Sequence, residues 1–338
     1  LSIASIVGAS SSSRLSSQKK NGEHQSRLLR QEEDYGYEFE KYGHSDRQYK
    51  KKTRHKPICP VGLPLGDINL LVVTDIHGWI AGQHARHEPY LNVDFGDLVS
   101  FYQQLSWQQN PPFLHRLLQP STDAAHGGGD GCAPRGDMFF LFNGDFMDGT
   151  GLSTIPPEHL TPLLQQAPFS ALNVGNHELY FNEVVDYMMQ RDGFIDHWQG
   201  TYLASNVDYI MKTDTSTSDG TTTAFPFGNR YTFLHGPVNN STILTFGFLY
   251  NFQNNCNHTR VQHVEETLQE EWFIEVLTSK KHHYDAIIVM AHMDAIDPLV
   301  YTILQGIRSL IGPRVPIQFI TGHSHRRAFY QLDPLASR

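Results

Sequence analysis

Residues 137–150 read "DMFFLFNGDFMDGT", an apolar run that ends abruptly in glycines and carboxylates. The run from Met138 to Phe142 has the length and composition of a strand that is buried on both faces. Asp145 and Asp148 follow it directly. Carboxylates in this position serve either a turn or a binding site, because ligands of open α/β sheets bind at the carboxyl ends of the strands.

Four further apolar runs along the chain end in the same way. Strands that alternate with helical patterns, each strand followed by polar residues, predict an α/β domain. The predicted strands are 68–73, 138–142, 170–174, 201–207, 230–236, 241–250, 284–292 and 316–323, and the predicted helices are 94–108, 157–166, 186–198, 263–277 and 297–311. The polar side chains at the five strand ends are Asp75, His77, Asp145, Asn176, His177, His292, His323 and His325.

These strand ends favour a metal site. Carboxylate, amide and imidazole ligands without thiolates suit Zn, Mn or Fe. Glycines 144, 175 and 322 come just before candidate ligands, where the missing Cβ allows a sharp turn and a close approach to a metal. Each motif alone is more commonly a turn or ordinary polar surface, but their recurrence at strand ends indicates one site. Eight groups are more than one ion needs, whereas seven bind two ions if one carboxylate bridges.

The bulk properties exclude several classes of function. The chain has 338 residues and a formal net charge of −9, which argues against a nucleic-acid binder but not against a small phosphorylated substrate. Cys59, Cys132 and Cys256 form no CxxC pair, so neither a thiolate zinc site nor a dithiol redox centre is expected, and one disulfide remains open. No apolar stretch is long enough to predict a transmembrane segment.

The N-terminal part of the chain differs in composition from the rest. The opening "LSIASIVGAS" resembles the end of a signal peptide, with a clipped, featureless terminus as the alternative, and residues 11–58 are polar and end in the basic "KKKTRHK". We therefore expect a leader remnant and disordered arm over residues 1–58 and one folded domain over 59–338, with a flexible insertion at about 119–136. Sequons at Asn239, Asn240 and Asn257 favour a secreted or vacuolar glycoprotein.

The motifs "DIH", "GDFMDGT", "GNHE", "AH" and "GHSH", in this order, resemble those of the calcineurin-like metallophosphoesterases. "GDFMDGTGLS" and "YLASNV" are most similar to the branch of 5′-nucleotidases and UDP-sugar hydrolases. "GNHELY" has Leu-Tyr where that branch commonly has Phe-Asp, which suggests a fungal-type relative. The resemblance covers about residues 68–328 and implies a four-layer α/β/β/α sandwich with a dinuclear metal centre.

The resemblance also implies a role for each residue. His177 would face the substrate phosphate, and the catalytic set would be His177, Asn176 and Asp145. A hydroxide held by two divalent ions would attack a phosphomonoester such as a 5′-nucleotide, as in nucleotide catabolism. The first metal would be bound by Asp75, His77 and His325, the second by Asn176, His292 and His323, and Asp145 would bridge them.

Two alternatives stay open at this point. One is a phosphodiesterase for cyclic nucleotides or sugar nucleotides that uses the same metals. The other is a non-catalytic, truncated relative that acts as a binding module, because the branch carries a C-terminal substrate domain and this chain ends just past "GHSH". The sequence leaves the oligomeric state open.

Several residues near the ligand motifs could have either a structural or a functional role. We expect Asp148 to stabilise the turn rather than to hydrogen-bond a ligand histidine, Glu178 to be structural, and Asn206 to brace the site. Surface or core positions are the simpler reading for the remaining candidates near the cleft, which are Trp79, His84, His87 and Tyr180.

Overall fold

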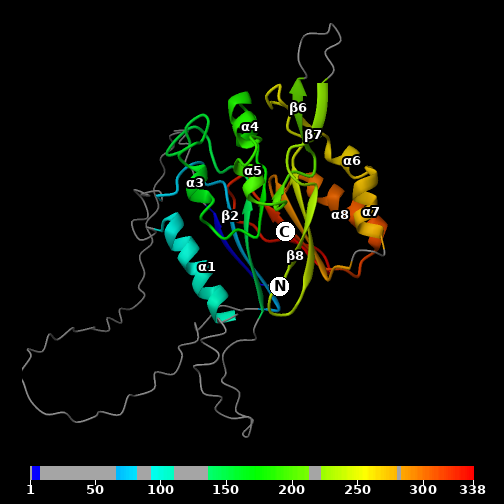
Figure 1. Cartoon of the computed structure of the whole chain (residues 1–338). Helices are drawn as coiled ribbons and strands as arrows, with labels where there is room; N and C mark the ends of the chain where they lie inside the picture. The colour runs from blue at the N-terminus through cyan, green and yellow to red at the C-terminus, as the bar shows by residue number, and fades with distance from the viewer. Residues whose placement is uncertain (1, 8–65, 82–92, 110–135, 213–221, 280–282) are drawn as a thin grey trace, which may run out of the picture. The chain divides into compact units, whose positions relative to one another are not determined.

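The computed structural model describes residues 2–7, 66–81, 93–109, 136–212, 222–279 and 283–338. The polar arm, His84, His87, Cys59, Cys132 and nearly all of the predicted insertion lie outside these ranges. Within them the chain forms two large sheets, a small three-stranded sheet and helices on both flanks (Figure 1).

The first sheet is parallel throughout. Its strands, in spatial order, are β1 (Ser2–Val7), β2 (Ile68–Thr74), β3 (Asp137–Asn143), β4 (Ala171–Asn173) and β5 (Tyr202–Leu203). β1 pairs with β2 from Ser2 opposite Asn69 to Val7 opposite Thr74. The β-branched residues of "SIASIV" are typical of strands, which explains the pairing.

The second sheet is mixed, with a parallel centre and antiparallel edges. Its spatial order is β13 (Gln331–Asp333), β14 (Ala336–Ser337), β12 (Ile317–Thr321), β11 (Ala286–His292), β9 (Thr242–Leu249) and β8 (Tyr231–His235). A third, antiparallel sheet consists of β10 (Thr259–Val261), β6 (Val207–Lys212) and β7 (Thr222–Pro226), and two of its strands project at the top of Figure 1.

Three apolar clusters fill the spaces between four layers. Leu71 and Val73 of β2 face the helices α1 (Phe95–Gln109), α3 (Thr161–Leu164), α4 (Asn182–Met188) and α5 (Phe194–His197). Leu70 and Val72, on the other face of the same strand, pack in a cluster with Ile288 of β11 in the second sheet. The outer face of the second sheet is covered by α6 (Val264–Thr267), α7 (Glu271–Thr278) and α8 (Pro298–Ile311).

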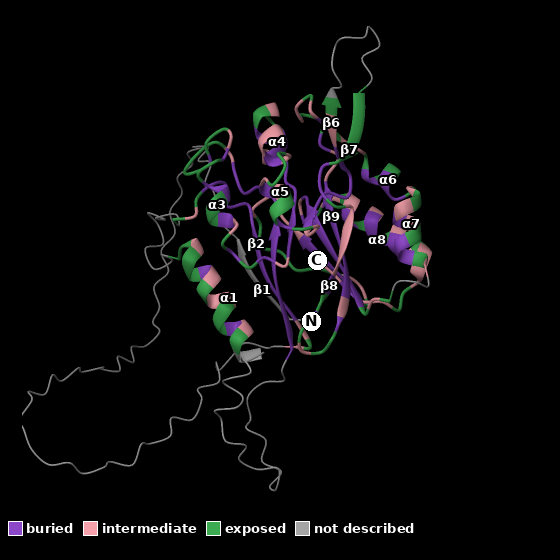
Figure 2. Ribbon diagram, in the orientation of Figure 1, coloured by how far each residue is buried: buried purple, intermediate pink, exposed green. Residues whose placement is uncertain are grey.

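The central strands of both large sheets are therefore buried on their two faces, as the purple strands of Figure 2 show. This is why their central strands read as continuous apolar runs in the sequence. The predicted four-layer α/β/β/α sandwich is confirmed.

Some predicted elements are interrupted. The helix expected over 186–198 divides into α4 and α5, because Asp192 has a φ of +58° that a right-handed helix cannot accommodate. The helix expected over 263–277 divides into α6 and α7, where Glu270 is extended. The strand expected over 201–207 breaks at Ser205 and Asn206 into β5 and β6.

Two buried asparagines connect the large sheets at the carboxyl ends of their strands. The Asn143 amide, at the end of β3, donates to the carbonyl oxygens of Ala291 (3.3 Å) and Ile320 (3.1 Å). The Asn173 amide, at the end of β4, donates to Asn143 Oδ1 (3.0 Å) and to the Met290 carbonyl (3.2 Å). These bonds hold the ends of β3, β4, β11 and β12 together, and the candidate residues lie just beyond these ends.

Candidate metal centre

The carboxyl ends of β2, β3, β4, β11 and β12 bring the predicted site residues together. His292 is the last residue of β11, and the others follow their strands within a few positions. Among the described residues, three groups have ligand atoms within 4.8 Å of one another and could hold a metal ion. They are Asp75 with His77 and His325, His77 with Asp145 and His177, and Asp145 with His292 and His323.

The backbone at these positions is unusual. Eight non-glycine residues of the described chain have positive φ, and five of them belong to the cluster. Left-handed conformations cost a non-glycine residue on the order of 1–3 kcal/mol and concentrate at functional sites. The five residues are Asp75, His77, Asp145, His323 and His325, with φ of +57°, +49°, +56°, +68° and +53°.

The glycines before the ligands allow the loops to approach one another. A Cβ on Gly144 would lie 2.6 Å from His292 Nδ1, and a Cβ on Gly322 would lie 2.5 Å from Thr74 Oγ1. A Cβ on Gly175 would overlap the carboxylate of Asp145. At all three positions, therefore, the loops can approach this closely only because glycine has no side chain.

Asp145 lies at the centre of the cluster and is almost fully buried. Its Oδ2 lies 3.0 Å from His292 Nε2, 3.9 Å from His177 Nε2 and 4.0 Å from His77 Nε2. Its Oδ1 accepts the His177 N–H at 2.9 Å. Burial raises the pKa of Asp145, but the charges and hydrogen bonds of His292 and His177 together lower it overall.

His292 is fixed by the strand next to it. Its Nδ1 lies 2.7 Å from the Asn143 carbonyl oxygen and donates to it, so Nε2 faces Asp145. Burial lowers the pKa of His292, yet the Asp145 charge raises it overall to about 10. Without a metal the two residues therefore form a buried ion pair, and a divalent cation would take the place of the proton.

A second pair of imidazoles meets beside Asp75. His325 Nε2 lies 3.1 Å from His77 Nε2 and 3.4 Å from Asp75 Oδ1. Two ring nitrogens at this distance cannot both carry a proton, so at least one presents a lone pair. Burial raises the pKa of Asp75, but the hydrogen bond from His325 and the charge of His292 lower it overall, so the carboxylate is ionised.

One buried oxygen of the cluster has no hydrogen-bond partner. The Asn176 amide nitrogen donates to the Tyr180 hydroxyl at 3.1 Å, whereas its Oδ1 is unpaired although Asn176 is 1% exposed. His77 Nδ1 is also buried and unpaired. Burying such acceptors without a partner is unfavourable, and a cation is the partner that suits a carbonyl oxygen among imidazoles and carboxylates. The residues present therefore fit divalent metal ions.

His177 lies at the open side of the cluster. Its side chain is 30% exposed, against 4% for His77. The two rings meet edge to face with their centroids 4.5 Å apart. His177 can therefore contact both the cluster and a molecule that enters from solvent.

Glu178 organises the loops and is more important than the sequence indicated. It is fully buried and accepts the N–H groups of Gly175 (2.7 Å), Asp145 (3.1 Å) and Phe146 (2.9 Å). Burial and the Asp145 charge raise its pKa to about 8. The sequence signal is only a carboxylate after "GNH", because its partners are backbone groups of distant residues.

Asp148 and Asn206 hold the surroundings in place. Asp148 Oδ1 accepts the Thr150 N–H at 2.8 Å, as expected of a turn residue, and its Oδ2 lies 3.8 Å from His77 Nδ1. Asn206 accepts the Leu249 N–H at 2.9 Å and donates to the Leu249 carbonyl at 2.8 Å, which fixes the end of β9.

Three other candidate residues are not members of the ligand groups. Trp79 and Tyr180 are 45% and 38% exposed, and Cys256 carries a free thiol. Within the described ranges, no helix has both the length and the apolar character needed to cross a membrane.

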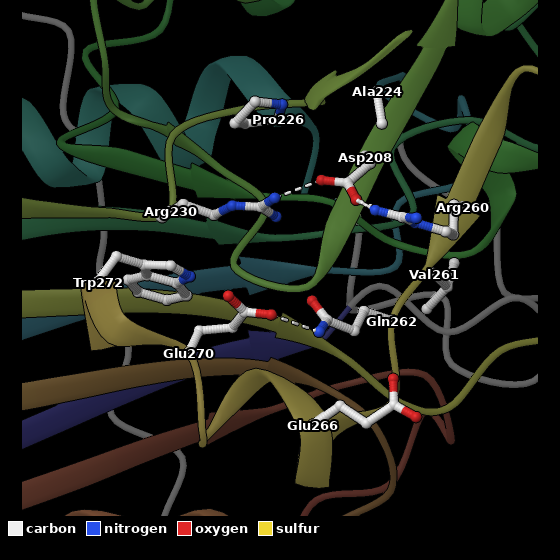
Figure 3. Close-up of a pocket in the computed structure, with 10 residues that line it drawn as sticks. All are labelled: Asp208, Ala224, Pro226, Arg230, Arg260, Val261, Gln262, Glu266, Glu270 and Trp272. Carbon is white, nitrogen blue, oxygen red and sulfur yellow. Dashed lines mark hydrogen bonds and ion pairs between the residues drawn. The ribbon is translucent and has the colours of Figure 1, made fainter. Parts of the chain in front are cut away.

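A separate pocket lies beside β6, β7 and β10 and contains none of the described residues of the cluster (Figure 3). Arg230 and Arg260 both pair with the buried Asp208 there, with Arg260 Nη2 2.6 Å from Asp208 Oδ2. Gln262 Nε2 donates to Glu270 at 2.8 Å. These five side chains pair with one another at the wall of the pocket, and their contacts link the small sheet to the second sheet.

Comparison with known proteins identifies relatives in fungi. A protein of Saccharomyces cerevisiae, described as uncharacterized, is 32% identical over 80% of this chain and 40% of its own length. A protein of Arthroderma benhamiae named "Secreted protein" is 30% identical over 82% of this chain and 37% of its own. The chain thus spans about two fifths of the length of these relatives.

A solved structure and a family model also match this chain. A 5′-nucleotidase from Candida albicans superimposes with a TM-score of 0.63 at 29% identity, over 80% of this chain and 44% of that protein. The family model of the calcineurin-like phosphoesterases matches residues 68–327, which include all the residues of the cluster. The chain belongs to the calcineurin-like phosphoesterase family.

Proposed function

We propose that the protein is a phosphohydrolase that depends on two divalent metal ions, Zn, Mn or Fe, and acts on phosphomonoesters such as 5′-nucleotides. The observation that carries the proposal is the position of Asp145, whose Oδ2 faces both His292 and His77 from two of the ligand groups. A shared carboxylate between two histidine-rich groups is what two neighbouring ions require.

The residues divide into two sets around this carboxylate. Asp75, His77 and His325 would hold one ion, and Asn176, His292 and His323 would hold the other. Two such ions, when bound, clamp phosphate oxygens and lower the pKa of a bound water. The chain's own contribution includes keeping two of the histidine ligands unprotonated, because burial is the largest cause that lowers the pKa of His77 and of His323.

His177 would act on the substrate itself. It lies within 3.9 Å of Asp145 Oδ2 and its side chain reaches solvent. From this position it would donate a hydrogen bond to a phosphoryl oxygen or a proton to the leaving oxygen. Asn176 and Asp145, which flank it, complete the proposed catalytic set.

The 5′-nucleotidase of Candida albicans supports a nucleotide as substrate, because it shares the fold at 29% identity. The match covers 44% of that protein. It therefore supports the class of substrate and not the choice of base or sugar. A role in nucleotide catabolism follows if the substrate is a 5′-nucleotide.

The same proposal includes entry into the secretory pathway, as a secreted or vacuolar glycoprotein. The Arthroderma relative is named a secreted protein. Asn239, Asn240 and Asn257 are all exposed, as an N-linked glycan requires.

Metal content and activity on two model esters test the proposal. Purified protein is assayed with p-nitrophenyl phosphate and bis-p-nitrophenyl phosphate, together with Asp145→Asn, His177→Ala and Glu183→Gln, an exposed control. We expect metal and monoesterase activity in the wild type and control, little metal in Asp145→Asn, and retained metal without turnover in His177→Ala. Preference for the diester would instead indicate a phosphodiesterase, and neither metal nor turnover would leave a binding module.

A further inference from the structure

The surroundings of Asn176 contain a residue whose position the sequence motifs do not explain. Tyr180 comes four residues later, after the 3₁₀ turn His177–Leu179, and the Leu179 N–H donates to the Asn176 carbonyl at 3.1 Å. This turn brings the Tyr180 hydroxyl to 3.1 Å from Asn176 Nδ2. The two side chains therefore meet on the same face of the turn.

The hydroxyl anchors the Asn176 amide. Nδ2 donates to the tyrosine oxygen, so Oδ1 is directed away from it and remains without a hydrogen-bond partner inside the protein. A tyrosine hydroxyl can donate as well as accept, but the reversed amide would present an N–H group to a cation, which electrostatics opposes. Tyr180 thus holds the amide in place, and in the observed orientation its carbonyl oxygen is available as a ligand.

The ring of Tyr180 has a second contact with the site. Its centroid lies 5.2 Å from that of His177, with the rings at 89°. On its other side it meets the buried Phe252 at 5.4 Å and 90°, so the ring is held from behind. Phe252 contacts Tyr250 at 5.6 Å, and Tyr250 packs against His323 at 4.6 Å.

Aromatic contacts therefore run continuously along one side of the cluster, from His177 through Tyr180 to His323. Edge-to-face pairs, such as those of Tyr180 with His177 and with Phe252, prefer defined ring angles. The contacts connect the proposed substrate-facing histidine with a proposed ligand of the second metal. Tyr180 is the member of this series that also hydrogen-bonds a ligand.

We propose that Tyr180 is a positioning residue, whose hydroxyl orients the Asn176 amide toward the second metal and whose ring holds His177 toward the substrate. The inference rests on the proposed function. It assigns two separable effects to one side chain, because the hydroxyl and the ring act on different neighbours.

Two variants separate these effects, and a third serves as control. Tyr180→Phe removes the hydroxyl and keeps the ring, whereas Tyr180→Leu removes both. Tyr187→Phe is the matched control, because its hydroxyl is partly buried and lies 2.6 Å from Thr161 Oγ1 in α3 rather than at the site. Mn²⁺ binding to each metal-free protein is measured by calorimetry, alongside kcat and KM for p-nitrophenyl phosphate.

In Tyr180→Phe we expect the affinity for the second Mn²⁺ to fall roughly tenfold, as for other partners that orient metal ligands. Its kcat should fall at saturating Mn²⁺ while KM and the unfolding temperature of the metal-free protein stay at the wild-type values. Tyr180→Leu should lose a further roughly tenfold in kcat through His177, which is part of the roughly 10²- to 10⁴-fold that a general acid–base group contributes. Tyr187→Phe should bind Mn²⁺ like the wild type.

The outcomes are distinguishable from failure of the proposed function. If the wild type binds two Mn²⁺ and Tyr180→Phe binds both with unchanged affinity, the role of Tyr180 is overturned and the proposed function stands. If the wild type binds no Mn²⁺ or Zn²⁺, both are overturned. A loss of affinity in Tyr187→Phe equal to that in Tyr180→Phe would also overturn the role, because it would reflect general destabilisation.

Discussion

Replacement of Glu178 by glutamine puts an NH₂ group in place of one acceptor oxygen at the point where three loops meet. The carboxylate accepts the N–H groups of Asp145 and Gly175 with Oε2 and that of Phe146 with Oε1. A glutamine oxygen in place of Oε2 keeps two of these bonds and turns an NH₂ group toward the Phe146 N–H. A buried donor that loses its acceptor costs about 1–3 kcal/mol.

For a domain of this size, that cost corresponds to a lowering of the unfolding temperature by roughly 2–12 °C. The assay is thermal unfolding of the metal-free protein by circular dichroism, with the exposed Glu183→Gln as matched control. We expect Glu178→Gln to unfold at lower temperature and the control to match the wild type. Unfolding of Glu178→Gln at the wild-type temperature would refute the role of Glu178 in holding the loops.

The pH dependence gives an independent readout of the same group. Burial and the Asp145 charge raise the pKa of Glu178 from 4.5 to about 8. The folded protein then binds more protons than the unfolded chain between these values, so the contribution of Glu178 is full below pH 4.5 and is lost as the pH rises through about 8. The metal-free wild type should therefore lose stability across this window, whereas Glu178→Gln should lose less.

Three further predictions concern the framework and the sequons. Asn173→Ala removes the donor to the Phe248 and Met290 carbonyls, so the free energy of unfolding in urea should fall by about 1–3 kcal/mol; no change would contradict the inter-sheet role. Asp333→Asn removes the pair with Arg308 (2.8 Å), whose hydrogen bond lowers the Asp333 pKa below 3.8. The variant should be about 1 kcal/mol less stable at pH 7. This contribution is lost as the pH falls below 3.8, so the urea midpoints of variant and wild type should converge in acid, and a constant difference would contradict this. Asn257→Gln, in protein secreted from yeast, should lower the mass by one glycan, and an unchanged mass would exclude glycosylation at that exposed position.

The fold was predictable where strands are buried on both faces. "LLVV", "MFFLF" and "AIIVM" are apolar throughout because Leu70 and Leu71, for example, contact opposite layers. Short edge strands such as β7, whose residues are all exposed, give no apolar pattern, so the β-rich composition of residues 222–251 predicted no separate strand there. The break between α4 and α5 depends on one left-handed residue, Asp192, which no helical periodicity reveals.

The candidate site was predictable to the extent that its residues follow strands. The five strand ends predicted eight side chains, and the structure brings the ligand atoms of seven of them, all except Asn176, into three overlapping groups. Glu178 was predicted to be structural without its partners, and Asn143 and Asn173 were not recognised as organising residues, because most of their partners are backbone groups far away in the sequence. Tyr180 likewise depends on how one 3₁₀ turn is placed against Phe252.

Anomalous diffraction from crystals of the protein loaded with Mn²⁺ tests the dinuclear centre most directly. We predict two anomalous peaks, one among Asp75, His77 and His325 and one among Asn176, His292 and His323, with Asp145 bonded to both. A single peak, no peak, or two peaks that do not share Asp145 would contradict the account.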